Sequence, residues 1–524
     1  MRYHAEHKFS GLRTELSSED PDVNRLLESL AFFSARIHNS VLRNLEYYRY
    51  RLHQQLFPYL LTPIPATGVL LGNVSGLVTE PVSIERGTDF VMRTDNEKDF
   101  YFQTGCPVKL LPIYLSAVRL APSEGVGSCL TIDINARHPL HEAPGLLSLL
   151  LNYIGDTQAS FRLLGFFKRH LTGLRIKYGL SRNTGDQEDE WSPLDLPVYG
   201  PQPIGMEEDN YFHPIEIERL FFIDPRTELF MHIACKKTEN PFSSFTLEFN
   251  FNESWPKGLV VNKDIFLINC LPIVNVRRLP SKPILLDGTL TNQPILSGHE
   301  DAGFELCKPL GVFKLEKEGM SPLMSGVVAH DSPCYEIESR VIEQKGRYFS
   351  NLIINYPETF EESAWVFVDA LWHQPSFAEY RERECQFFPY ALNLPGVQWE
   401  WCFLPAQQSA QLGMSDSTDI LLDILHITHK HYYNTEDLRT IMQILGSIVD
   451  GPYRPVYSAF KSARHEIRSV ENERQTAGYV IYFLDFDWAS IDQDDELFHL
   501  FLTHLEKVLN EWSNEKEIRI SIEA

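Results

Sequence analysis

The sequence has few cysteines, and none of them lie close together. The eight cysteines occur singly, without a C-x-x-C pair, at Cys106, Cys129, Cys235, Cys270, Cys307, Cys334, Cys385 and Cys402. Disulfide scaffolds and structural zinc sites need closer spacing, so the pattern favours buried free thiols in a reducing compartment. The first residues contain no apolar segment typical of a secretory signal, and no run of about 18 apolar residues lacks charges. We therefore predict a cytoplasmic protein with no direct membrane insertion.

Positive charge is also scarce. The chain carries 47 Lys and Arg against 71 Asp and Glu, a formal net charge of −24. Duplex binding depends on neutralising phosphates with basic side chains, so we predict no nucleic-acid partner. Anionic membrane surfaces are disfavoured for the same reason. The acidic surface that remains indicates solvation rather than a specific ligand.

Motifs of catalysis and cofactor binding are missing as well. There is no G-x-x-x-x-G-K-[ST] loop for phosphates, no G-x-G-x-x-G after a strand and no nucleophile elbow. Two sets of possible metal ligands fit poorly, because one lacks an H-E-x-x-H pattern and the other lacks the glycine of a calcium loop. These sets are His426, His429 and His431, and Asp485, Asp487 and Glu496. We predict no catalytic residue, no metal and no cofactor.

A long amphipathic helix is the clearest element that the sequence does contain. Asp20 suits the N-cap, Pro21 suits the first helical position, and Pro58 ends a pattern that runs to Phe57. Apolar residues recur every three or four positions, at Val23, Leu26, Leu27, Leu30, Phe33, Ile37, Val41 and Leu45. Such a helix can pack on its own domain or on a helix of a partner, and the pattern leaves both open.

The rest of the chain predicts an α+β multidomain protein. Apolar residues make up 43% of the sequence, enough to build large packed cores. Short β-prone runs between turn residues indicate β-rich, sandwich-like middle domains, and alternating helix and strand patterns indicate a small α/β domain at the end. We predict a helical segment at 1–62, a first β-rich mixed domain at 63–205, a second β-rich domain at 206–415 and the α/β domain at 416–524.

A series of short segments can be compared with known families. Residues 20–37 read DPDVNRLLESLAFFSARI and residues 57–65 read FPYLLTPIP, followed by IERGT at 84–88, VKLLPI at 108–113 and FLINCLPIVN at 266–275. In order and spacing these segments resemble the TssF family (VasA or ImpG) of type VI secretion system baseplate subunits, which typically opens with DPxVERLLEAFAFLxARV. The chain departs from the family at residues 275–277, which lack the usual Leu-Phe after the asparagine.

This resemblance implies a non-enzymatic wedge component of a phage-tail-like baseplate. Two copies would join one TssG, with TssE and TssK, around the VgrG spike hub, and support sheath and tube polymerisation. The assembled complex would lie at the cytoplasmic face of the inner membrane. The long helix would enter a bundle shared with TssG, and the residues that we predict for this contact are Val23, Leu26, Leu30, Phe33 and Ile37.

Two other classes of protein remain as alternatives. The aromatic content and the many short strands also fit a carbohydrate-active enzyme on a β-rich fold. The carboxylate pair of such an enzyme is defined by three-dimensional spacing, which the sequence does not reveal. A receptor-binding or adhesin module is the other alternative, but it would normally carry an export signal, and none is visible.

Overall fold

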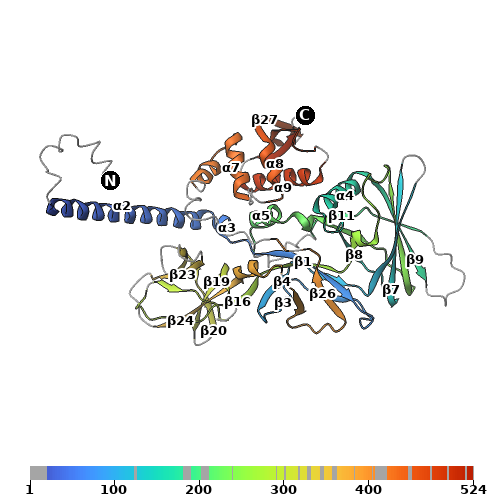
Figure 1. Cartoon of the computed structure of the whole chain (residues 1–524), viewed down its shortest axis with the longest axis horizontal. Helices are drawn as coiled ribbons and strands as arrows, with labels where there is room; N and C mark the ends of the chain where they lie inside the picture. Colours follow the sequence, from blue (N-terminus) through green and yellow to red (C-terminus); the bar gives the residue numbers. More distant parts are fainter. Residues whose placement is uncertain are drawn as a thin grey trace. The chain divides into compact units, whose positions relative to one another are not determined.

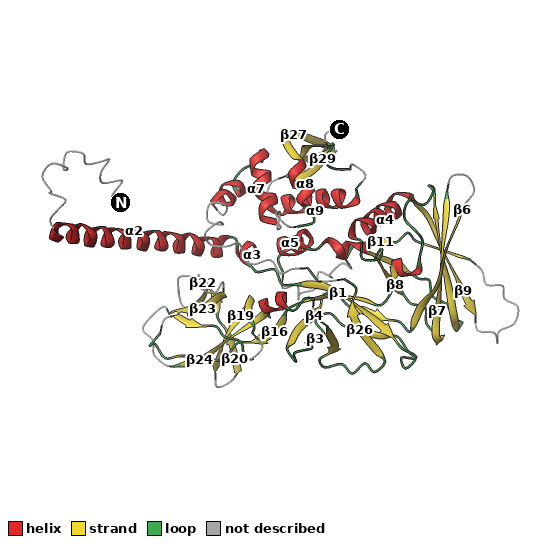
Figure 2. Cartoon of the chain, in the orientation of Figure 1, coloured by secondary structure: helices red, strands yellow, loops and turns green. Residues whose placement is uncertain are grey.

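The chain is described by a computed structural model with several β-sheets and helices (Figures 1 and 2). The residues that it describes are 21–122, 127–180, 191–201, 212–238, 240–290, 292–299, 303–316, 319–326, 332–342, 347–356, 363–382, 384–403, 405–406, 422–445, 451–472, 475–492, 495–513 and 516–522. Two compact units can be separated, Met1–Leu61 with Leu412–Leu422, and Thr62–Gln411 with Asp423–Ala524. The predicted α+β multidomain class is confirmed, whereas the four predicted domain boundaries stay a prediction.

The first unit contains the predicted long helix. Helix α2 spans Pro21–Leu56, and a short helix, α3, follows at Pro58–Leu61. The helix ends where Pro58 interrupts the series of backbone donors, and the last backbone bond of this series joins Phe57 N to His53 O at 2.8 Å. This confirms the helix expected from the apolar spacing, although the expected N-cap, Asp20, lies outside the described residues.

A six-stranded sheet in the second unit joins distant parts of the sequence. Its order is β25-β3-β4-β15-β1-β26, and the strands are Cys385–Pro389, Asp89–Thr94, Asp99–Thr104, Cys270–Val274, Thr67–Val74 and Val397–Trp401. The two outer strands, β25 and β26, also contact each other, so the sheet curls toward a barrel. Alternate residues of β4 are buried, and the interior is aromatic, with the rings of Phe90 and Trp399 5.1 Å apart.

Two further antiparallel sheets follow β4 in the chain. The five-stranded sheet β10-β9-β13-β7-β6 uses Ser192–Leu194, Leu171–Leu180, Phe242–Phe251, Ser128–Leu140 and Ile113–Pro122. The four-stranded sheet β11-β12-β8-β14 uses Val198–Tyr199, Phe230–Ala234, Leu146–Leu151 and Phe266–Leu267. Helix α4, Thr157–His170, is capped by the Asp156 carboxylate and packs Phe167 against Phe249 of β13, with ring centroids 5.6 Å apart.

A β-sandwich is formed by residues between 277 and 373. One sheet contains β16, β17, β19, β20 and β24, at Arg277–Pro280, Ile284–Leu286, Glu305–Glu316, Gly319–Pro322 and Ala364–His373. The other contains β18, β21, β22 and β23, at Asn292–Pro294, Met324–Ser325, Cys334–Ile342 and Arg347–Asn355. Val368 of β24 and Leu352 of β23 belong to the same buried core, which lies between the sheets as sandwich packing requires.

The end of the chain forms the predicted α/β domain. Strands β27 (Phe460–Asn472) and β28 (Gln475–Phe486) form a hairpin, and helix α9 (Glu496–Trp512) connects β28 to the parallel strand β29 (Glu517–Ile522). Helix α7 spans Thr435–Leu445. Thr435 is its first residue, and Asn434 caps the helix, since its side-chain Oδ1 accepts from Asp437 N at 2.9 Å.

The cysteines and the connecting segments complete the comparison with expectation. All eight cysteines are free, and Cys106, Cys235, Cys270, Cys307 and Cys334 are buried. The predicted burial is confirmed for these five, whereas Cys129, Cys385 and Cys402 are partly exposed. Residues 180–205 are rich in Gly, Pro, Asp and Glu, which predicts an exposed loop, but β10 and β11 lie within this stretch, because each pairs with a longer strand. Short strands of two or three residues carry too little apolar periodicity to be recognised in a sequence.

Candidate functional site

An exposed apolar stripe on α2 is the most prominent surface of the first unit. The exposed fractions of Leu30, Phe33 and Ile37 are 61%, 58% and 64%. Val41 and Tyr48 continue the stripe, with 59% and 64% exposed. These positions are separated by three, four or seven residues, so they share one side of an α-helix. A row of this length is unusual on the surface of a protein that acts alone.

The predicted contact residues can be placed on this helix. Leu30, Phe33 and Ile37 lie together on the stripe, whereas the side chains of Val23 and Leu26 lie outside the described residues. Tyr48, one heptad after Val41, continues the stripe but was not among the predicted contact residues.

The C-terminal end of α2 differs from the stripe because His53 and the following Phe57 are buried. The imidazole of His53 stacks on the ring of Phe57, with centroids 6.3 Å apart, and no hydrogen bond to its ring nitrogens is found among the described residues. Burial lowers the pKa of His53, which favours the neutral form at pH 7. The exposed stripe is therefore followed by a buried contact between Phe57 and an imidazole whose neutral form is favoured.

The possible metal ligands do not come together. Within the described ranges, no group of three or more His, Cys, Asp or Glu side chains is arranged to hold a metal ion. Glu496 is instead paired with Lys168 and Arg169 of α4, at 2.9 and 3.6 Å. Asp487 accepts from Ser490 Oγ at 2.9 Å and pairs with Lys461. These contacts give the acidic residues of the apparent calcium loop a role in holding elements together.

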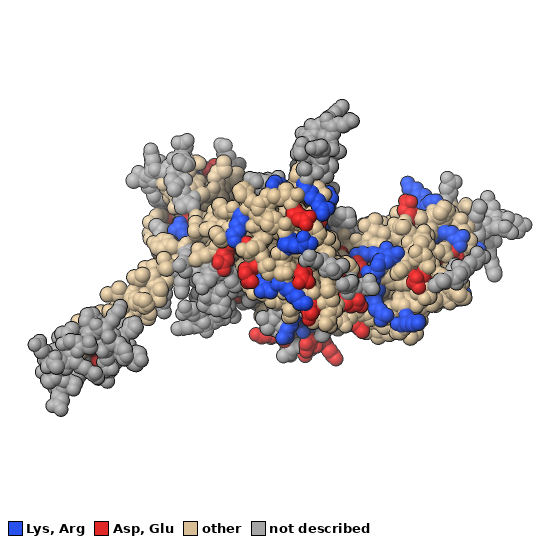
Figure 3. Space-filling view, turned by 90° about the horizontal axis from the view of Figure 1, so that it is seen from above, with Lys and Arg blue, Asp and Glu red and all other residues tan. Residues whose placement is uncertain are grey.

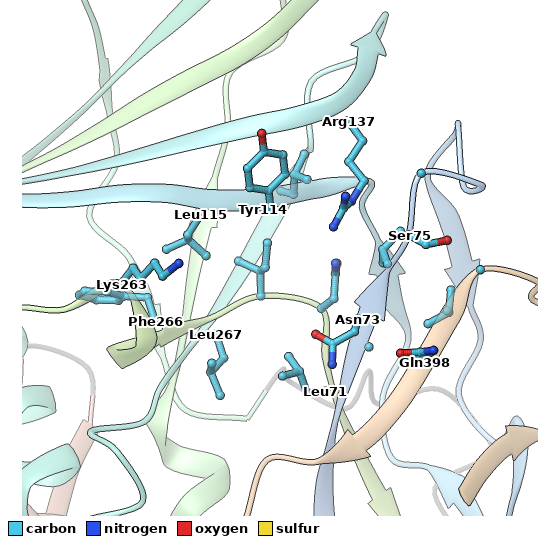
Figure 4. Close-up of a pocket in the computed structure, with 18 of the residues that line it drawn as sticks. Leu71, Asn73, Ser75, Tyr114, Leu115, Arg137, Lys263, Phe266, Leu267 and Gln398 are labelled. Carbon is cyan, nitrogen blue, oxygen red and sulfur yellow. The ribbon is translucent and has the colours of Figure 1, made fainter.

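A cavity of about 750 Å³ lies beside β1, β6 and β26 and the turn at Lys263–Ile265 (Figure 4). Its lining includes the cations Arg137 and Lys263, and Asp264 is the carboxylate among its lining residues. Glycoside hydrolysis uses two carboxyl groups that face each other across the scissile bond. The cavity does not offer this pair, so it gives no support to the carbohydrate-active alternative.

A buried ionic cluster joins α9 to α5, which spans Pro214–Ile223. His504 of α9 contacts Glu218 at 2.5 Å and Glu228 at 3.3 Å, and its ring stacks on Phe221 with centroids 3.4 Å apart. Burial lowers the pKa of His504, but hydrogen bonds to the two carboxylates and their negative charge outweigh it and raise the pKa overall. The cluster thus favours the charged form of His504 and links two chain segments almost 300 residues apart.

These features define a class of protein, namely multidomain α+β proteins with several packed sheets and an exposed amphipathic helix. A family model described as "Type VI secretion system, TssF" matches residues 10–351, and the chain belongs to this family. The chain is therefore a component of the type VI secretion system baseplate. A comparison with curated proteins gives no match. In the part of the chain that the structure describes, no helix combines the length and apolar character of a membrane span.

Solved structures share the fold across almost the whole chain. One similar chain comes from a cryo-electron microscopy structure of the type VI secretion system TssK-TssF-TssG baseplate subcomplex. It has 16% identity and a TM-score of 0.73, with 95% of this chain and 96% of that chain covered. Another comes from the baseplate complex of the type VI secretion system, with 14% identity, a TM-score of 0.61 and coverage of 100% and 95%. At this identity the likeness concerns the fold alone.

The departure from the family at residues 275–277 has a structural role. The guanidinium of Arg277 lies between the rings of Tyr101 and Tyr390, 4.3 and 4.5 Å from their centroids. It also donates to Asp89 at 3.2 Å, and Asn275 donates to Tyr101 O at 2.8 Å. Contact with an aromatic ring stabilises a guanidinium, although Arg277 Nη1 is buried and has no hydrogen-bond partner among the described residues. Arg277 therefore joins the start of β16 to strands β3 and β4 of the barrel-like sheet through contacts that an apolar pair would not make.

Proposed function

We propose that the chain is a non-enzymatic wedge subunit of the baseplate. Two copies assemble with one TssG-like subunit, and with TssE-like and TssK-like subunits, around a VgrG hub. This wedge supports sheath and tube polymerisation at the cytoplasmic face of the inner membrane. The chain takes part through its surfaces and carries out no chemical step.

One observation carries this proposal, the exposed stripe of α2. Leu30, Phe33 and Ile37 are each more than half exposed on one side of a 36-residue helix. Burying a Leu, Ile or Phe side chain contributes about 1.5–3 kcal/mol relative to leaving it in water. This exposure supports packing against a partner helix over packing on the chain's own domain. Leu30, Phe33 and Ile37 form the contact in the bundle, with Leu26 one turn and Val23 two turns before Leu30.

The distribution of charge on the surface is consistent with a scaffold. Basic and acidic side chains are interspersed on the face seen in Figure 3, without a broad positive area of the kind that nucleic acids require. With a net charge of −24, attraction between copies of the chain depends on apolar surface rather than on general electrostatics.

Co-purification from the native bacterium tests the proposal. The chain is tagged, and its partners are identified and counted by quantitative mass spectrometry. We expect TssG-like, TssE-like and TssK-like chains, with this chain in twofold excess over the TssG-like chain. Recovery of this chain alone as a stable monomer would refute the wedge role. A ratio of one to one with the TssG-like chain would contradict the two-copy part.

A further inference from the structure

The cavity beside β1 contains two cations that have no ion-pair partner among the described residues. Arg137, at the end of β7, is exposed, and its guanidinium lies 5.3 Å from the centroid of the Tyr114 ring. Lys263 is exposed on the short turn before β14. Asp264 also lines the cavity and accepts a hydrogen bond from Asn262 Nδ2 at 3.0 Å, but it forms no ion pair with either cation among the described residues. In a chain with 24 more acidic than basic groups, two cations outside ion pairs attract an anion.

The position of Arg137 is fixed by its neighbours. Its backbone N donates to Pro112 O at 2.8 Å, and the next residue, His138, donates from Nε2 to Gly76 O at 2.8 Å. The latter bond joins the end of β7 to the turn that follows β1. The ring of Tyr114 gives the guanidinium a cation–π contact at 5.3 Å. Restricting a side chain before binding lowers the entropy that a ligand contact costs.

The two cations lie on opposite sides of the cavity. Figure 4 shows Lys263 near Leu115 and Phe266, and Arg137 reaching toward Asn73. The lining also contains partly exposed apolar side chains, among them Leu71, Leu115 and Leu267. A small anion reaches one cation at a time, whereas an extended chain with alternating side chains can meet both cations and these apolar side chains.

We infer that this cavity binds an extended acidic segment of a partner protein, with carboxylates on Arg137 and Lys263 and apolar side chains between them. The carboxylates form charge-assisted hydrogen bonds, and the arginine fork suits a bidentate one. The exposed amide of Gln398 lies at the Arg137 side and accompanies the peptide backbone, whereas Asn73 Nδ2 already donates to Glu400 Oε1 at 2.7 Å. The inference goes beyond the stripe of α2 and relies on the proposed assembly role for the source of the segment.

Fluorescence anisotropy with the full-length chain and a labelled hexapeptide of alternating Asp and Leu tests this inference. We expect saturable binding that weakens at least tenfold when Asn replaces Asp in the peptide, because the charge-assisted bonds are lost. The double variant Arg137→Ala/Lys263→Ala should weaken binding at least tenfold as well. Both side chains are exposed, so the variant should unfold at an unchanged temperature in a thermal scan.

A matched control removes the same charge elsewhere. Lys237→Ala/Lys257→Ala replaces two exposed lysines outside the cavity lining, and its binding should stay within twofold of the unsubstituted chain. Equal binding of the Asp and Asn peptides, or equal loss in both double variants, would overturn the inference. No binding of either peptide would overturn it too. The assay uses a synthetic probe, so its outcome is independent of whether a TssG-like partner co-purifies.

Discussion

Replacing the apolar stripe of α2 should break the proposed bundle while leaving the helix intact. In the triple variant Leu30→Gln/Phe33→Gln/Ile37→Gln, glutamine retains a high helix propensity. About six tenths of each side chain is exposed and available for burial. At about 1.5–3 kcal/mol for full burial, the loss is about 1–2 kcal/mol per residue and about 3–5 kcal/mol in total. Affinity for the TssG-like partner should fall by about two to four orders of magnitude.

The assay is co-purification from cells that make the tagged chain and its partners, with the partner ratio measured by mass spectrometry. A control variant, Glu28→Gln/Arg36→Gln/Asn39→Gln, alters exposed residues away from the stripe and should keep the normal ratio. Helical content, measured by circular dichroism, should match in both variants. An unchanged partner ratio in the stripe variant would refute the assignment of this face to the bundle.

Three further perturbations test the second unit by thermal unfolding. The raised pKa of His504 means that its stabilising charge is fully present below about pH 6.5 and is lost as the pH rises through the elevated folded value. The melting temperature should therefore fall as the pH rises through this range, and it should change less with pH in His504→Gln. The same change of melting temperature with pH in both proteins would contradict this. Arg277→Leu should destabilise by about 2–3 kcal/mol, because two ring contacts and an ion pair disappear. Gly68→Ala should cost about 1–3 kcal/mol, since a Cβ there would lie 2.5 Å from the Trp401 ring, whereas Gly76→Ala meets nothing within 4 Å and should be neutral. An unchanged melting temperature in Arg277→Leu would refute the role of the Arg277 contacts. An unchanged melting temperature in Gly68→Ala would refute the close packing of Trp401 on Gly68.

The elements that follow from local pattern were predicted well. Helix α2 was expected over 20–57 and spans Pro21–Leu56, and α9 was expected over 497–512 and spans Glu496–Trp512. Both have long amphipathic periodicity, which needs no knowledge of the rest of the chain. The strand expected at 518–522 was found at Glu517–Ile522 because its apolar residues alternate.

The arrangements that depend on distant pairing could not be predicted. The barrel-like sheet pairs β1 with β15 and β26, about 200 and 330 residues further along the chain, and no local pattern records such a partner. The contacts of Arg277 could not be predicted for the same reason, because its partners are distant in the sequence. The sequence showed only that residues 275–277 depart from the family pattern. The cavity was missed entirely, since Arg137 and Lys263 are separated by more than 100 residues and belong to no motif.

The strand order of the barrel-like sheet also affects when the sheet can be completed during synthesis of the chain. A ribosome releases α2 early, but β26, which completes the sheet beside β1, follows Leu56 by about 340 residues. At roughly 5–20 residues per second, the helix emerges roughly 20 to 70 s before that strand exists. During this interval the apolar stripe is present on a nascent chain in which the six-stranded, barrel-like sheet is incomplete. In the proposed bundle, the helix is therefore available to its partner before the fold of this chain is complete.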